Sequence, residues 1–120
     1  MKKPTSFEQA LKMTGRPVVD FTNVPEDLKS YFEKQYKAVV ITEAIREGKK
    51  SNMLDTTERK WFPIFSVEPA SPSGFVFRCS GCNDTIARAG YTSRLCFGSE
   101  AEADYAGETF TEIYSGIIIE

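Results

Sequence analysis

Histidine is missing from this sequence, and its absence excludes several large classes of enzyme and metalloprotein. Ser-His-Asp and Cys-His nucleophile systems need an imidazole to move a proton, and many zinc sites use it as a ligand. Long apolar runs are missing too, since no stretch of about 18 apolar residues is available to span a bilayer. The first residues are charged and lack an apolar stretch, so we expect neither a secretory signal nor a membrane span.

Cysteine is scarce as well. The chain has three cysteines, an odd number, so a closed disulfide framework cannot use all of them. Without a secretory signal, a reducing compartment is the simpler environment, and free thiols are the default state there. We therefore expect a cytoplasmic protein. Phosphate-binding loop patterns, G-x-G-x-x-G, internal repeats and low-complexity tracts are also absent from the sequence.

Bulky apolar residues, in contrast, are plentiful enough for one core. The 120 residues are 41% hydrophobic and include nine Phe, five Tyr and one Trp. Domains commonly contain about 100–200 residues, so the length and composition predict a single domain over residues 1–120.

Charge is unevenly distributed along the chain. Residues 1–60 carry 12 Lys and Arg against 9 Asp and Glu, whereas residues 61–120 carry 3 against 8. The net charge of −2 lacks the basic excess of a nucleic-acid-binding domain, so nucleic acid is not an expected partner. We interpret the lysines of the first half as solvent-facing helix residues. The alternative is a two-sided surface whose basic end attracts an acidic partner.

Capping patterns predict two helices in the first half. Thr5 and Glu8 form an S/T-x-x-E pattern for a short helix that ends at Gly15. A much longer helix is predicted over Asn23–Glu47, with its first residue as the cap.

The apolar residues of this long helix change face along its length. A straight helix with one buried face cannot bury the apolar residues of both halves, so we interpret this helix as buried on two sides, against the first helix and a sheet. A kink near residues 38–40 and a short strand over Ala38–Thr42 are the alternatives. The first group is Leu28, Tyr31, Phe32, Tyr36 and Val39, and the second is Val40, Ile41, Ala44 and Ile45.

A two-residue period predicts three strands in the second half. Trp61–Val67 has apolar residues on both faces, and Pro63 within it indicates a sheet edge or a bulge. A turn rich in Pro and Gly leads into a partner strand over Phe75–Cys79. A long loop over residues 80–92 then precedes a third strand over Ser93–Phe97.

A last helix is predicted after Ser99, with Glu102 completing a capping box. Its apolar residues from Ala103 to Ile117 fall on one stripe, and we expect the terminal isoleucines to pack back or to pair with a partner. The order of elements predicts an α+β fold, a small three-stranded antiparallel sheet with three helices packed mainly on one face.

Five segments carry a resemblance to other proteins: Tyr31–Tyr36, Trp61–Pro63, Gly74–Arg78, Ser93–Phe97 and Ala103–Gly107. Through them most of the chain resembles a family of small uncharacterised proteins that occurs in gut-bacterial genomes and their phages or prophages. The resemblance implies a prophage-like context and an unknown function. It implies no catalytic residue.

Cys79 and Cys82 form a C-x-x-C pair, the only local motif with an evident chemistry. Such a pair can supply half of a zinc site, with Cys96 as a third ligand and Asp84 as a fourth. A redox-active pair usually opens a helix, whereas this pair lies where a strand is expected to enter a turn. We predict no bound metal or cofactor, with Cys79 buried in the core and Cys82 the most exposed. Cys96 should point away from both of its neighbours, because side chains alternate along a strand.

Three further groups have both a functional and a structural interpretation. Aromatic residues of the sheet could stack on single-stranded nucleic acid, but such platforms need a basic groove, so core packing is favoured. Arg78, Arg88 and Arg94 could hold a phosphate or carboxylate, although arginines in an acidic half more often neutralise nearby carboxylates. The carboxylates within residues 100–104 suit a helix start without acid–base catalysis. The aromatic residues are Trp61, Phe62, Phe65, Phe75 and Phe77.

Taken together, the sequence favours a non-enzymatic, phage-like accessory protein that acts through protein–protein interaction or self-association. This hypothesis follows from the missing catalytic constellation, the strands that are apolar on both faces and the apolar C-terminal tail. The alternative is a small metal-dependent or nucleic-acid-handling factor that uses the Cys79 and Cys82 pair or the aromatic sheet face.

Overall fold

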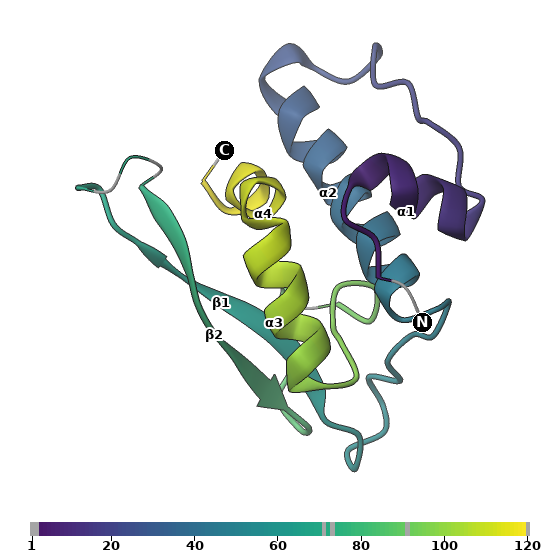
Figure 1. Cartoon of the computed structure of the whole chain (residues 1–120), viewed down its shortest axis with the longest axis vertical. Helices are drawn as coiled ribbons and strands as arrows, with labels where there is room; N and C mark the ends of the chain where they lie inside the picture. Colours follow the sequence, from purple (N-terminus) through teal and green to yellow (C-terminus); the bar gives the residue numbers. More distant parts are fainter. Residues whose placement is uncertain (1–2, 71, 73, 91, 120) are drawn as a thin grey trace.

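A two-stranded antiparallel sheet and four helices make up the part of the chain that the computed structural model describes, residues 3–70, 72, 74–90 and 92–119. The α+β class is as expected, but the three-stranded sheet with three helices is wrong. The helices are α1 (Phe7–Thr14), α2 (Glu26–Ile45), α3 (Glu100–Thr109) and α4 (Thr111–Ile118), and the strands are β1 (Lys60–Val67) and β2 (Phe75–Asn83) (Figure 1).

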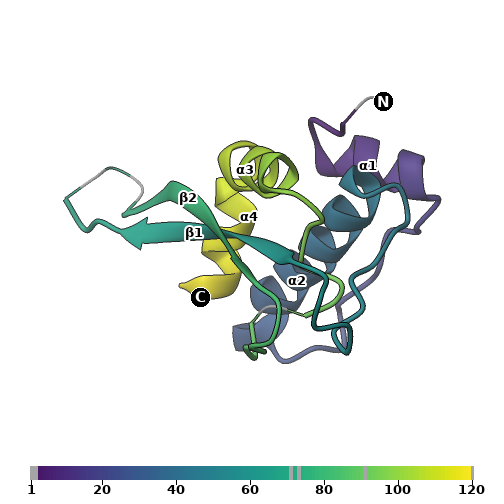
Figure 2. The same cartoon turned by 90° about the horizontal axis from the view of Figure 1, so that it is seen from below.

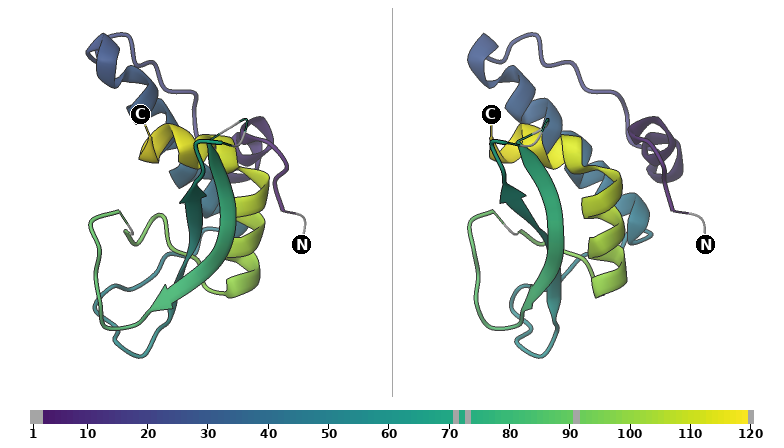
Figure 3. Two further views of the ribbon diagram at one scale, coloured as in Figure 1. Left: turned by 90° about the vertical axis from the view of Figure 1, so that its left-hand side faces the viewer. Right: turned by 60° about the vertical axis from the view of Figure 1, so that its left-hand side comes forward.

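The elements are arranged in layers. α3 and α4 cover one face of the hairpin, α2 packs against α4 beyond them, and α1 lies outermost against α2 (Figure 2). Segments 84–90 and 92–98 lie on the other side of the hairpin from α3 (Figure 3). In the described ranges, none of the helices combines the length and apolar character that a membrane crossing requires.

The predicted third strand, Ser93–Phe97, does not form. Within residues 93–97, all of which the structure describes, only Phe97 bridges to β1, donating to the carbonyl of Trp61 at 2.7 Å and accepting from its N–H at 2.9 Å. The preceding residues form a turn, in which the N–H of Cys96 donates to the carbonyl of Thr92. This turn uses the N–H groups that a ladder would need. Cys96 and Phe97 are both buried, so the alternation expected of a strand is lost.

Strand β2 is longer than predicted and contains a bulge. It continues past Cys79 to Asn83, and Arg78 has no partner residue on β1. A bulge adds one residue and reverses the alternation of side chains, so Ser80 instead of Cys79 faces α3. The prediction that Cys79 is buried in the core is therefore wrong, and its side chain is exposed.

Burial on two sides holds for only one half of α2. The helix begins at Glu26 after Pro25, without a cap from Asn23, and Leu28 and Phe32 in its first turns are 42% and 43% exposed. Its second half enters the core between α1 and α4 as a continuous helix, so neither a kink nor a strand occurs there. The buried residues of this half are Ala38, Val40, Ile41, Thr42, Ala44 and Ile45.

The ends of α1 follow the local signals with one change. Ser6, not Thr5, caps the helix, because its Oγ accepts a hydrogen bond from the N–H of Gln9 at 3.2 Å. Thr5 instead donates to the side chain of Gln9. Gly15 ends the helix in the left-handed region (φ 73°), as predicted.

The last helical stretch is divided into α3 and α4. Its N-terminus is capped as predicted, since Ser99 Oγ accepts from the N–H of Glu102 at 3.2 Å and the Glu102 carboxylate accepts from the N–H of Gly98 at 2.9 Å. The backbone leaves the helical region at Phe110 (φ −117°, ψ 31°), where α4 begins in a new direction. The predicted stripe is nevertheless buried, at Ala103, Ala106, Phe110 and Tyr114.

Candidate functional site

An apolar groove of about 330 Å³ opens between α2, α4, β1 and residues 89–90 and 92–95. We call this space the apolar groove. Its lining residues from the helices are Tyr31, Gln35, Val39, Tyr114, Ile117 and Ile118, and those from β1 and the loop are Pro63, Phe65, Ala89, Gly90, Thr92, Arg94 and Leu95.

Helical spacing and ring packing shape this groove. Tyr31, Gln35 and Val39 lie four residues apart and therefore on one face of α2. Phe65 stacks on the ring of Phe75 with 4.7 Å between the centroids, and it contacts the ring of Tyr114 at 5.3 Å. These three rings connect β1, β2 and α4, so this part of the groove is continuous with the hydrophobic core.

The hydroxyl of Tyr114 is buried, and among the described residues it has no hydrogen-bond partner of normal geometry. Burial raises the pKa of Tyr114, and the nearby hydroxyl of Thr42 opposes this effect only in part. The phenol therefore stays protonated at neutral pH. It contributes a ring to the groove wall instead of an acid or base.

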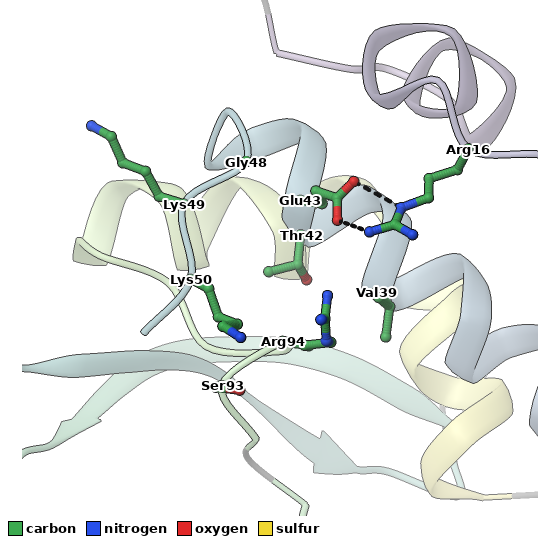
Figure 4. A pocket seen from close by; sticks show the side chains of 9 residues that line it. All are labelled: Arg16, Val39, Thr42, Glu43, Gly48, Lys49, Lys50, Ser93 and Arg94. Atoms are coloured by element: carbon green, nitrogen blue, oxygen red, sulfur yellow. Dashed lines mark hydrogen bonds and ion pairs between the residues drawn. The ribbon is translucent and has the colours of Figure 1, made fainter. Parts of the chain in front are cut away.

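A second cavity, of about 220 Å³, adjoins the groove, and we call it the cationic pocket (Figure 4). Four of its side chains are cationic and one is a carboxylate. The lining residues are Arg16, Val39, Thr42, Glu43, Gly48, Lys49, Lys50, Ser93 and Arg94.

One cation and the carboxylate of this pocket are paired with each other. Arg16 Nε and Nη2 donate to the two carboxylate oxygens of Glu43 at 3.0 and 2.7 Å, a bidentate arrangement (Figure 4). The guanidinium of Arg16 lowers the pKa of Glu43 through this hydrogen bond, with a smaller contribution from the charge of Arg94. Glu43 is therefore ionised at neutral pH and held by Arg16.

The other three cations have no such partner. Within the residues that the structure describes, the side chains of Lys49, Lys50 and Arg94 make neither an ion pair nor a hydrogen bond. Lys50 and Arg94 extend into the pocket below Glu43, whereas Lys49 points away from it (Figure 4). The pocket therefore has a positive potential that its single carboxylate does not balance.

The apolar groove and the cationic pocket share a boundary. Val39 and Arg94 line both cavities, so the two cavities lie side by side. Among the described lining residues, neither cavity contains a thiol, and Glu43 is the only carboxylate. This arrangement is suited to binding a ligand that is apolar at one end and anionic at the other.

The three cysteines are not brought together. Cys79 and Cys82 both lie on β2 beyond its bulge, so their side chains point to opposite faces of the strand, about 10 Å apart along it. A zinc ion needs both sulfurs within about 2.3 Å. Cys96 is buried, which raises the pKa of its thiol. Over the described ranges no three His, Cys, Asp or Glu side chains cluster around a common point.

The other predicted site residues have local structural roles or are exposed. Phe65, Phe75 and Phe77 pack among themselves beneath the helices. Asp104 accepts a hydrogen bond from the hydroxyl of Ser80 at 2.6 Å. The exposed residues Arg78, Arg88 and Glu100 line neither cavity, whereas Phe62 is buried and Trp61 half-buried.

Sequence reasoning considered Arg94 as one of three possible anion ligands but favoured a structural role for it, and it missed Arg16, Lys49 and Lys50. The one signal for them was the cationic surplus of residues 1–60, which we interpreted as a solvent-facing surface. Arg94 lies in the acidic half of the chain, and the fold brings it to the cations of the basic half.

Comparison of this chain with protein-family models, with curated proteins and with solved structures gives no match in any of the three.

Proposed function

We propose that this chain is a non-enzymatic accessory protein, of phage or prophage context, that works by binding a segment of another protein in the apolar groove. The observation that carries the proposal is the groove itself, a concave apolar space that opens at the surface between α2 and α4. Pockets of this kind, with a few polar groups at one end, are typical binding sites.

Exposed apolar side chains next to the groove support the same role. Leu28 and Phe32 lie on the first turns of α2, next to the groove residue Tyr31. Ile118 is the last residue of α4, and the exposed Ile119 follows it. Ile118 is 57% exposed although it lines the groove. Large apolar residues that gather at the surface commonly mark interaction sites, because a partner removes them from water.

The chemistry of the lining residues supports binding over catalysis. Glu43 is held by Arg16, and Tyr114 is a buried, protonated phenol, so neither is suited to transfer a proton. The prophage context rests on the sequence resemblance. We place the protein in the cytoplasm, where its cysteines would stay reduced.

Affinity capture with matched variants tests this proposal. The tagged protein, Ile118→Asp and Leu54→Asp would each be exposed to an extract of a bacterium that encodes the chain. Leu54 is 92% exposed in a loop and lines neither cavity, so it is the control. A protein captured by the parent and by Leu54→Asp but lost with Ile118→Asp supports the proposal.

Capture that does not depend on position 118, or no capture at all, contradicts the proposal. Light scattering on the purified chain distinguishes a second copy from a different protein as the partner. An Ile118-dependent dimer would make the partner another copy of this chain.

A further inference from the structure

We infer that the partner segment carries an acidic side chain beside its apolar residues, and that this carboxylate enters the cationic pocket while the apolar residues fill the groove. The inference rests on the proposed function and adds the chemistry of the partner. It follows from three features of the site, which are the unbalanced charge, the shared wall and the size of the two cavities.

The unbalanced charge favours an anion. Lys50 and Arg94 extend into the same space, where two like charges raise the free energy of the protein unless an anion lies between them. Glu43 does not balance both charges, because its own negative charge is already matched by that of Arg16, its bidentate partner. Ser93 also lines the pocket, and its hydroxyl can donate a hydrogen bond to a bound carboxylate, whereas the hydroxyl of Thr42 already donates to the carbonyl of Ala38 at 2.7 Å.

The shared wall fixes how the acidic residue is spaced from the apolar ones. Val39 and Arg94 belong to both cavities, so the carboxylate and the apolar side chains of one ligand must lie within a few residues of each other. An arginine can contact apolar groups with its methylene stem while its guanidinium stays in the polar pocket. Arg94 therefore suits the junction.

The size of the cavities favours side chains of a peptide. The cationic pocket, of about 220 Å³, has room for one acidic side chain, and the groove, of about 330 Å³, has room for one or two apolar side chains. Both lie at the surface and are bordered by the exposed residues Ile118 and Lys49, so a chain could enter and leave the site at its two ends.

A phage-displayed library of random 12-residue peptides tests the inference without knowledge of the natural partner. The library would be selected on the parent, on Lys50→Gln combined with Arg94→Gln, and on Arg78→Gln as a control of equal type. Arg78 is exposed on β2 and lines neither cavity. Positions 50 and 94 are also exposed, so all three proteins should fold, which circular dichroism would verify.

Three results distinguish failure of the inference from failure of the proposed function. We expect the parent and Arg78→Gln to enrich peptides with Asp or Glu near apolar residues, and the double variant to enrich apolar residues alone. Apolar enrichment without an acidic preference in the parent would overturn the inference and leave the groove as a docking site. No enrichment on any protein would contradict both.

Titrations then measure the contribution of the pocket. An enriched peptide should bind Lys50→Gln and Arg94→Gln each about tenfold more weakly than the parent, since a charged hydrogen bond is lost. Arg78→Gln should bind as the parent does, and the affinity of the parent should fall with added salt. Dodecanoate serves as the competing small anion. If dodecanoate binds in an Arg94-dependent way and no peptide does, the occupant is a small amphipathic anion and the inference is wrong.

Discussion

The close approach of α3 to the hairpin makes Gly107 a sensitive position. A Cβ placed there would lie 2.4 and 2.5 Å from ring carbons of Phe77 and 2.9 Å from the Cβ of Pro63. Comfortable carbon contacts are about 3.5–4.0 Å, so α3 or the hairpin would have to move by about 1 Å. Overpacking of this kind costs up to about 3 kcal/mol, against a gain of about 1 kcal/mol in helix propensity. Gly107→Ala should therefore destabilise the fold by about 2 kcal/mol.

Gly116→Ala is the matched control in α4. Its new Cβ would lie 2.5 Å from Cγ of Lys34, but that flexible side chain can change rotamer toward solvent. We expect its stability to equal or exceed that of the parent, because the propensity gain remains. Urea unfolding followed by circular dichroism measures both variants. A Gly107→Ala protein as stable as Gly116→Ala would refute the packing of α3 described above.

Three further predictions concern α2, the cysteines and pH. Ile41→Asp should destabilise the fold by about 3 kcal/mol or more, since Ile41 is 1% exposed. Phe32→Asp should destabilise it by less than about 1 kcal/mol, because Phe32 is 43% exposed, and thermal melts of both variants check this difference. Iodoacetamide should alkylate the exposed Cys82 in the native protein and the buried Cys96 only after unfolding, as mass spectrometry of digests would show. Because Cys82 is exposed, Cys82→Ser should change the free energy of unfolding by less than about 0.5 kcal/mol. The pKa of Glu43 is lowered in the fold by its bound guanidinium, so its contribution to stability is complete above the ordinary value of 4.5 and is lost as the pH falls through the lowered pKa. A urea midpoint that stays constant as the pH falls well below 4.5 would contradict that pairing.

Local signals predicted much of the fold. The capping box at Ser99 and the glycine at position 15 act through hydrogen bonds and backbone angles of neighbouring residues, so the sequence alone reveals them. The alternation in Trp61–Val67 is equally local. These elements formed where the pattern indicated, within one or two residues.

The predictions for Cys79 and for the third strand were wrong because residues distant in the sequence determine the local structure there. The bulge at Arg78 depends on the register between β1 and β2, and it determines which face Cys79 occupies. The turn before Phe97 competes with a strand of the same composition, and Arg46, the residue that follows α2, favours the turn by donating to the carbonyl of Cys96 at 3.0 Å. Neither the strand register nor the Arg46 hydrogen bond can be detected from the spacing of apolar residues along the sequence.

The candidate site was only partly predictable for the same reason. Arg94 was recognisable as a cation in an acidic half, but its proximity to Lys50 arises from the packing of the loop residues around 93–95 beside α2. The groove likewise combines residues from four separate parts of the chain. A one-dimensional pattern shows which side chains are charged or apolar, and it does not show which of them share a cavity.

Mapping of a bound peptide by NMR tests the central claim most directly. Amide and methyl shifts of the labelled protein would be followed while a library-selected peptide is added. We predict that the largest changes fall on residues 31–39 of α2, on 49–50 and 92–95, and on 114–118 of α4, around the groove and the cationic pocket. Changes centred on the hairpin at residues 75–83, with the groove residues unaffected, would contradict the account.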